Sequence, residues 1–152
     1  KQKTAYEIRN CDWSSDVCSS DLTFAPLEAG PSRHAVELPV LDQVERTDLY
    51  LYVPKRYQPT QPAPLLLWGH GAGGTGASQH QLWADVAEAT GMLVLAPTAF
   101  DKQPGYHFAP RERAAALAAV RWVRRLANVD ENAVFVGGWS QGAHQEIGRA
   151  HV

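Results

Sequence analysis

A Gly-Trp-Ser-Gln-Gly segment at residues 138–142 carries the clearest chemistry in the chain, because it directly follows a short apolar run at residues 133–136. This is the G-x-S-x-G pattern, which in a sharp turn from a strand into a helix lifts a serine hydroxyl above the end of a sheet. Bulky side chains two positions before or after that serine would collide, and Gly138 and Gly142 occupy those positions. We therefore predict that Ser140 is a nucleophile, with an ordinary glycine-rich loop as the alternative.

A second glycine-rich loop, His-Gly-Ala-Gly-Gly at residues 70–74, begins one residue after the apolar run 65–68. A hydrolase that forms a tetrahedral intermediate needs two hydrogen-bond donors aimed at the developing oxyanion. One is normally the backbone N–H after the nucleophile, which here belongs to Gln141. We expect Ala72 in the 70–74 loop to supply the other donor.

The neighbours of Ala72 have supporting roles in this interpretation. Gly71 and Gly73 would keep the loop backbone accessible, and His70 would be structural. A glycine-rich loop that opens a helix can instead cradle a phosphate. No G-K-[ST] is present, so the oxyanion role is favoured.

Apolar runs and helical repeats alternate along the chain and place both loops at strand ends. Continuous apolar runs are typical of strands buried on both faces, and helical spacing separates them. Strands are predicted at residues 34–41, 47–53, 65–68, 92–96 and 133–136, and helices at residues 78–90 and 110–127. This order predicts an α/β fold with a mostly parallel sheet flanked by helices and an antiparallel first pair at its edge.

The same patterns predict which side chains face inward and where the chain turns. The inward positions are Leu49, Leu51 and Val53 on the second strand, Leu82, Val86 and Ala89 on the first helix, and Ala116, Val120, Val123 and Ala127 on the second. Residues 130–132 are predicted to form a turn. Arg121, Arg124 and Arg125 are interpreted as a solvated helix end rather than a phosphate site.

Residues 47–145 resemble the N-terminal half of an α/β-hydrolase. They are most similar to the esterase branch that contains phospholipase/carboxylesterases and polyhydroxybutyrate-depolymerase-like enzymes. The resemblance rests on YVPKRY (52–57), PLLLWGHGAGGTG (64–76), LVLAP (93–97) and VFVGGWSQGAH (134–144). It implies that Ser140 accepts the acyl group of a small-molecule ester, that Ala72 and Gln141 bind the oxyanion, and that no cofactor or metal takes part.

Trp139 keeps a competing interpretation open. A tryptophan before the serine also occurs in prolyl-oligopeptidase-like peptidases, so the chain could belong to a serine peptidase of the same fold. A non-catalytic binding protein that retains the sheet is a third possibility.

Composition excludes several other classes of protein. A net charge of −2 argues against a broad nucleic-acid-binding face, and no apolar run is long enough to span a bilayer. Two cysteines in 152 residues do not make a disulfide framework. Localisation and oligomeric state are not readable from the sequence.

Both ends of the chain are expected to be non-native. Codons allowed for residues 15–22 (SDVCSSDL), read on the opposite strand, encode residues 146–152 (EIGRAHV) and then a stop. One DNA element would thus flank the insert in both orientations, and it resembles a short-read sequencing adapter. We therefore expect residues 1–22 and 146–152 to be adapter-derived. Residues 23–145 would then be a metagenomic fragment, the N-terminal half of one domain.

The catalytic base and its orienting acid are expected to be missing from the chain. In this fold family the order is Ser, then Asp or Glu, then His, and only residues 141–145 separate the serine from the expected adapter. His144 lies one helical turn beyond the serine and cannot reach back to it. The remaining histidines precede Ser140 or lie in the adapter segment: His34, interpreted as a surface strand residue, His70, His80, His107 (with Asp101) and His151.

Overall fold

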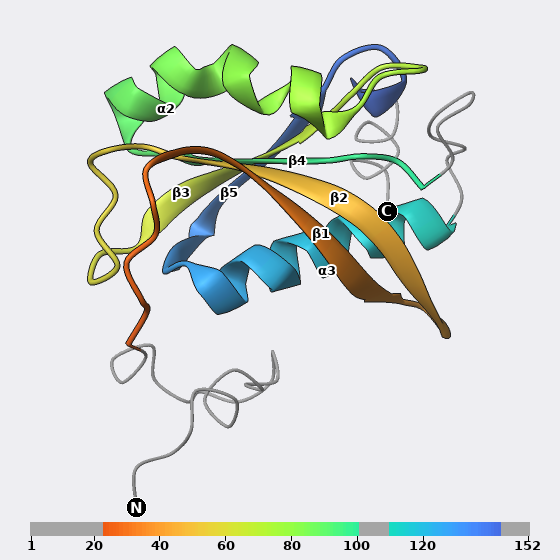
Figure 1. The fold of residues 1–152 in the computed structure, drawn as a ribbon, viewed down its shortest axis with the longest axis horizontal. Helices are drawn as coiled ribbons and strands as arrows, with labels where there is room; N and C mark the ends of the chain where they lie inside the picture. The colour runs from red at the N-terminus through yellow and green to blue at the C-terminus, as the bar shows by residue number, and fades with distance from the viewer. Residues whose placement is uncertain (1–22, 101–109, 144–152) are drawn as a thin grey trace, which may run out of the picture.

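A long hairpin opens the described part of the chain (Figure 1). The computed structural model describes residues 23–100 and 110–143, so both expected adapter segments and Asp101, His107 and His144 lie outside it. Strand β1 (Gly30–Val40) pairs antiparallel with β2 (Gln43–Val53) along its full length. Leu49, Leu51 and Val53 are buried, as the alternation predicted.

Three further strands complete a five-stranded sheet with the order β1-β2-β4-β3-β5. They are β3 (Ala63–Gly69), β4 (Leu93–Pro97) and β5 (Val129–Gly138). β3 pairs in parallel with both β4 and β5, and β2 joins β4 antiparallel. The predicted α/β class, with parallel strands and an antiparallel pair at one edge, is confirmed. The carboxyl ends of β3, β4 and β5 lie on the same side of the sheet, and ligands of open α/β sheets bind just beyond these strand ends.

Helices cover the two faces of this sheet (Figure 1). α3 (Pro110–Leu126) packs on the face formed by β1 and β4, and its predicted inward positions are all buried. On the other face lie two short 3-10 helices (Gly76–Ser78 and His80–Trp83) and α2 (Ala84–Thr90). The main core lies between α3 and the sheet. A smaller cluster of Leu66, Ala87 and Val94 lies beneath α2.

The prediction of a regular helix over residues 78–90 was wrong. The chain makes 3-10 turns up to Trp83 before the α-helix begins, and Leu82 and Val86 are 67% and 40% exposed. A 3-10 helix has about three residues per turn. A prediction that assumes the 3.6 residues per turn of an α-helix therefore places side chains of this segment on the wrong face. Ala87 is buried, and Trp83 packs on Trp68 with ring centroids 4.6 Å apart.

Strand β5 is longer than the predicted run 133–136. That run was expected to be central in the complete fold and to be left as an exposed apolar edge here. In the described sheet β5 is an edge strand, and Phe135 and Val136 are 51% and 37% exposed. The turn predicted at 130–132 falls inside the strand bounds, where the register with β3 shifts. A hydrogen bond typical of such a turn is nevertheless present, because the Asn132 N–H donates to Asp130 Oδ1 at 2.9 Å.

His34 is not the plain surface residue that was expected. It is partly buried, and its ring lies 4.9 Å from that of Trp122 on α3. Because the strand face around His34 packs against α3, burial lowers the pKa of the His34 imidazole.

At the C-terminal end of α3, Arg124 forms an ion pair with Glu131, consistent with an ordinary helix end.

Candidate active site

Ser140 lies in a strained turn immediately after β5. Its φ is +53°, and among the residues that the structure describes only Leu41 is another non-glycine residue with positive φ. The Gly142 N–H donates to the Trp139 carbonyl oxygen at 3.0 Å and closes the turn, and residues 141–143 are helical. A left-handed backbone costs an L-residue about 1–2 kcal/mol, and such strain clusters at functional sites. Ser140 is exposed in the part of the chain that the structure describes.

Three glycines allow the turn to pack closely against the end of β3. A Cβ on Gly138 would lie 2.4 Å from the carbonyl carbon of Gly142, and one on Gly142 would lie 2.5 Å from that of Gly69. Such distances do not occur between real atoms, and all of the neighbours involved are backbone. The predicted crowding around Ser140 is therefore present. Gly69, at the end of β3, was not singled out in the sequence.

The structure brings the 70–74 loop beside the serine. A Cβ on Gly71 would lie 3.4 Å from Ser140 Cβ and 3.1 Å from Trp139 Cδ1. The Trp139 N–H donates to the Gly69 carbonyl oxygen at 3.0 Å, which ties the turn that carries Ser140 to the end of β3. The two glycine-rich motifs, distant in sequence, thus form one site at the carboxyl edge of the sheet.

The loop itself is a tight turn that exposes Ala72. The Gly74 N–H donates to the Gly71 carbonyl oxygen at 3.0 Å, and Gly73 has a φ of +67°. A turn with a left-handed third residue favours glycine at that position. Ala72 is exposed, while Gln141 after the serine is partly buried. The assignment of their N–H groups as oxyanion donors remains a prediction.

His70 fastens this loop to the segment that follows β4. Its side chain is fully buried, Nδ1–H donates to the Gly71 carbonyl oxygen at 2.7 Å, and Nε2 accepts the Ala99 N–H at 3.0 Å. A carbonyl only accepts and an amide only donates, so these partners fix a neutral ring protonated at Nδ1. Burial lowers the pKa of His70, and the bond to Gly71 partly opposes that shift. His70 is therefore a structural residue, since its ring nitrogens hold backbone groups.

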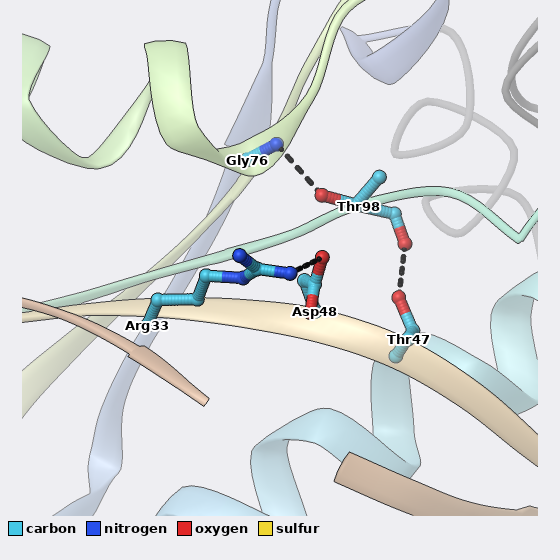
Figure 2. A network of polar contacts seen from close by, with 5 residues as sticks. All are labelled: Arg33, Thr47, Asp48, Gly76 and Thr98. Carbon is cyan, nitrogen blue, oxygen red and sulfur yellow. Dashed lines mark hydrogen bonds and ion pairs between the residues drawn. The ribbon is translucent and has the colours of Figure 1, made fainter. Parts of the chain in front are cut away.

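Thr98 fixes the segment that follows β4 to its neighbours (Figure 2). Its buried hydroxyl accepts the Gly76 N–H at 3.0 Å, and its carbonyl oxygen accepts the hydroxyl of Thr47 at 2.7 Å. The Thr98 N–H donates to the Asp48 carbonyl oxygen at 2.9 Å. The segment after β4 is thus fixed to β2 and to the loop after residues 70–74. Nothing in the linear sequence indicated this role for Thr98.

The other described histidines lie away from the serine. His34 Nε2 is 2.9 Å from Ser32 Oγ on β1, at the opposite edge of the sheet from β5. His80 is buried beside Tyr50, with ring centroids 5.4 Å apart, and burial lowers its pKa. Among the described residues, none of these histidines is placed as a base for Ser140, whose role as a nucleophile remains a prediction.

A small apolar cavity lies beneath the segment after β4. It has a volume of about 30 Å³, and its wall includes Gly69, Ala99, Phe100 and the buried Glu112. The described residues contain no group of three or more His, Cys, Asp or Glu side chains that could hold a metal ion. No described helix combines the length and apolar character that crossing a membrane would require.

Solved structures similar to this chain include esterases and a depolymerase. A poly(3-hydroxybutyrate) depolymerase from Bordetella parapertussis is 23% identical with a TM-score of 0.60, over 80% of this chain and 46% of its own. An acetyl xylan esterase from Aspergillus awamori is 21% identical with a TM-score of 0.61, over 75% and 44%. A bacterial heroin esterase is 26% identical with a TM-score of 0.60, over 85% and 40%.

These comparisons establish the fold. The chain has the α/β-hydrolase fold, as the resemblance of residues 47–145 implied. It spans less than half of the length of each of these structures. No protein-family model and no curated protein sequence matches it.

Proposed function

We propose that this chain carries the nucleophile half of a serine hydrolase that cleaves carboxylic esters through an acyl-enzyme. The observation that carries the proposal is Ser140, exposed at positive φ with the Gly71 loop packed beside it. A strained, accessible serine next to a glycine-rich backbone loop is the arrangement that acyl transfer requires. The esterase structures that share the fold support the same reaction class.

In the proposed reaction, Ser140 Oγ attacks the ester carbonyl carbon and the carbonyl oxygen becomes an oxyanion. Backbone N–H groups of Gln141 and Ala72 would stabilise that charge, a contribution worth about 3–4 kcal/mol per donor in well-studied hydrolases. The alcohol leaves, and water then releases the acid from the acyl-serine. His70 and Thr98 position the loop backbone and do not transfer protons.

The general base and its orienting acid would come from polypeptide outside residues 23–145. We propose that residues 23–145 are the N-terminal half of the domain and that the two flanks are translated adapter, since residues 15–22 and 146–152 can be encoded by opposite strands of one DNA element. Loss of the base in a Ser-His-Asp system costs on the order of 10⁶ in turnover. The 152-residue chain is therefore expected to be nearly inactive.

Hydrolysis of p-nitrophenyl acetate by the 152-residue chain and by the protein extended from its genomic locus tests this proposal. The extended protein should turn over the ester and react with a fluorophosphonate probe, and Ser140→Ala should abolish both. Enzyme-like turnover by the short chain, lost in Ser140→Ala, would show that the base is already present. A locus with no adapter boundary at residues 22 and 146 would contradict the proposed flanks.

The same locus separates the two alternative functions. A serine peptidase, suggested by Trp139, would cleave a prolyl-peptide p-nitroanilide faster than the ester. A non-catalytic binding protein would lack an Asp and a His after later strands and would fail to react with the fluorophosphonate. Either result would overturn the esterase assignment while leaving the α/β-hydrolase fold unchanged.

A further inference from the structure

The outward side of α3 carries positive charge that no acidic residue of the helix balances. Beyond the first residue of α3, its exposed residues are Arg113, Leu117, Arg121 and Arg125. Each lies four positions after the last, a spacing that places neighbouring side chains on one side of a helix. We call these four residues the basic face. Glu112 is the one acidic residue of α3 and is buried, so the helix offers no exposed carboxylate.

Helix stability does not account for the basic face. The helix dipole favours cations near the C-terminal end, whereas Arg113 lies near the N-terminal end, where the dipole disfavours them. Arg121 and Arg125 repel one another, because like charges four residues apart are neighbours on a helix. Arg124 differs, since it is paired with Glu131 and lies outside the basic face. The uncompensated charge therefore suits an anionic partner.

The tip of the β1–β2 hairpin adds an exposed apolar side chain on the side of the sheet that α3 covers (Figure 1). Leu41 is 66% exposed there, and its φ of +56° is a region that leucine adopts only with strain. Glycine would fit such a turn without strain, so the leucine does not serve the turn. Arg111 Nε–H donates to Glu45 Oε1 at 2.6 Å, which places the tip beside the N-terminal end of α3.

Both features lie away from the edge at which further strands of the domain would join. β1 and β5 are the opposite edges of the described sheet, and α3 packs on β1 and β4. The basic face points away from the sheet, because the opposite side of α3 is buried against it. Strands added beyond β5 would extend the sheet sideways and would leave this face exposed.

We propose that this chain binds the surface of an anionic lipid bilayer through the basic face, with Leu41 and Leu117 inserted among the lipid headgroups. Such binding would be independent of the proposed ester hydrolysis. Guanidinium groups form paired hydrogen bonds with phosphate, and an exposed leucine gains free energy on leaving water. A helix ridge and a hairpin tip are both convex, so they fit a flat, deformable surface. A protein partner would instead need an acidic groove that matches both shapes.

Flotation with lipid vesicles tests this binding, because unbound protein and aggregates do not float. The 152-residue chain should float with vesicles of phosphatidylcholine and phosphatidylglycerol, but not with phosphatidylcholine alone. Each arginine at an anionic surface is worth roughly fivefold in partitioning, so Arg113→Gln, Arg121→Gln and Arg125→Gln together should weaken binding on the order of a hundredfold. Leu41→Gly should weaken it about tenfold. Urea unfolding should show that Leu41→Gly is no less stable, since glycine adopts a positive φ freely.

The matched control removes the same charge from the other side of the molecule. Arg33 and Arg46 occupy register positions on the same face as Tyr50, which packs on His80, and Arg56 bonds to the end of α2. Gln at all three positions should leave flotation nearly unchanged.

Four outcomes would overturn the proposal. They are no flotation with the anionic vesicles, equal losses in the two triple variants, unchanged binding of Leu41→Gly, and equally tight binding to soluble polyglutamate. The last would show a general preference for polyanions in place of a lipid surface.

Discussion

A Cβ on Gly142 would lie 2.5 Å from the carbonyl carbon of Gly69, so the turn that carries Ser140 rests directly on the backbone at the end of β3. This contact couples the two motifs of the site. The Trp139 N–H donates to the Gly69 carbonyl oxygen at 3.0 Å in the same place. The position of the serine is thus set by backbone packing against β3, and no flexible side chain can move aside to relieve a larger residue.

Gly142→Ala should therefore destabilise the chain by roughly 1–3 kcal/mol, since an added methyl group must displace backbone atoms. The free energy of unfolding from urea denaturation measures this. Gly30→Ala is the comparison, because nothing lies within 4 Å of a Cβ there and its cost arises from a φ of +103° alone. Equal stability of Gly142→Ala and the unmodified chain would show that the turn is not packed against Gly69.

Acidification should weaken the fold through His70. Burial lowers its pKa below the ordinary 6.5, so the unfolded state binds its proton more readily than the folded state. The stabilisation is therefore fully present above about pH 6.5 and is lost as the pH falls through the folded-state pKa. Urea unfolding near pH 7.5 and near pH 5.5 should show lower stability at the acidic pH.

His34 and His80 contribute in the same direction, because burial lowers the pKa of each. Comparison with a variant isolates the part due to His70. His70→Gln should be less stable near pH 7.5 and should show a smaller loss on acidification. If the variant loses as much stability as the unmodified chain between the two pH values, His70 is not the titrating group.

Removing the hydroxyl of Thr98 should leave a buried donor without its partner. Thr98→Val keeps the shape of the side chain but deprives the Gly76 N–H of its acceptor, which should cost about 1–3 kcal/mol. Thr98→Ser keeps the acceptor and should cost less. Arg33→Met, which removes an exposed ion pair with Asp48 in the same region (Figure 2), should change stability by no more than about 1 kcal/mol. A larger effect of Arg33→Met than of Thr98→Val would reverse this ranking.

The sequence was sufficient to predict the strands, α3 and the position of Ser140. These features depend on local patterns: continuous apolar runs for β3 and β4, a 3.6-residue repeat for α3, and glycines on both sides of the serine. The 3-10 turns before α2 were missed because their side chains face inward with a different period. The exposure of Phe135 depends on strand order, which a local pattern does not contain.

The contacts that fix the site were missed for a related reason. The bonds from Ala99 to His70 and from Gly76 to Thr98 join segments 29 and 22 residues apart. Thr98 lies outside the quoted motifs and Gly69 was given no role within one, so only the folded arrangement shows that they hold the loop backbone. Gly76 was missed for the same reason. A Cβ there would lie 2.1 Å from the carbonyl oxygen of Ala96 on β4, so the need for glycine depends on a residue that is distant in sequence.

Relieving the strain at Ser140 should stabilise the chain while removing the proposed nucleophile. With φ at +53°, serine occupies a backbone region that glycine adopts without steric cost. Ser140→Ala removes the hydroxyl but keeps the Cβ, so it retains the strain. Ser140→Gly relieves the strain, at the expense of greater freedom in the unfolded chain. We expect Ser140→Gly to be about 1 kcal/mol more stable than Ser140→Ala in urea unfolding. If the alanine variant were the more stable of the two, the left-handed turn would not be present in solution.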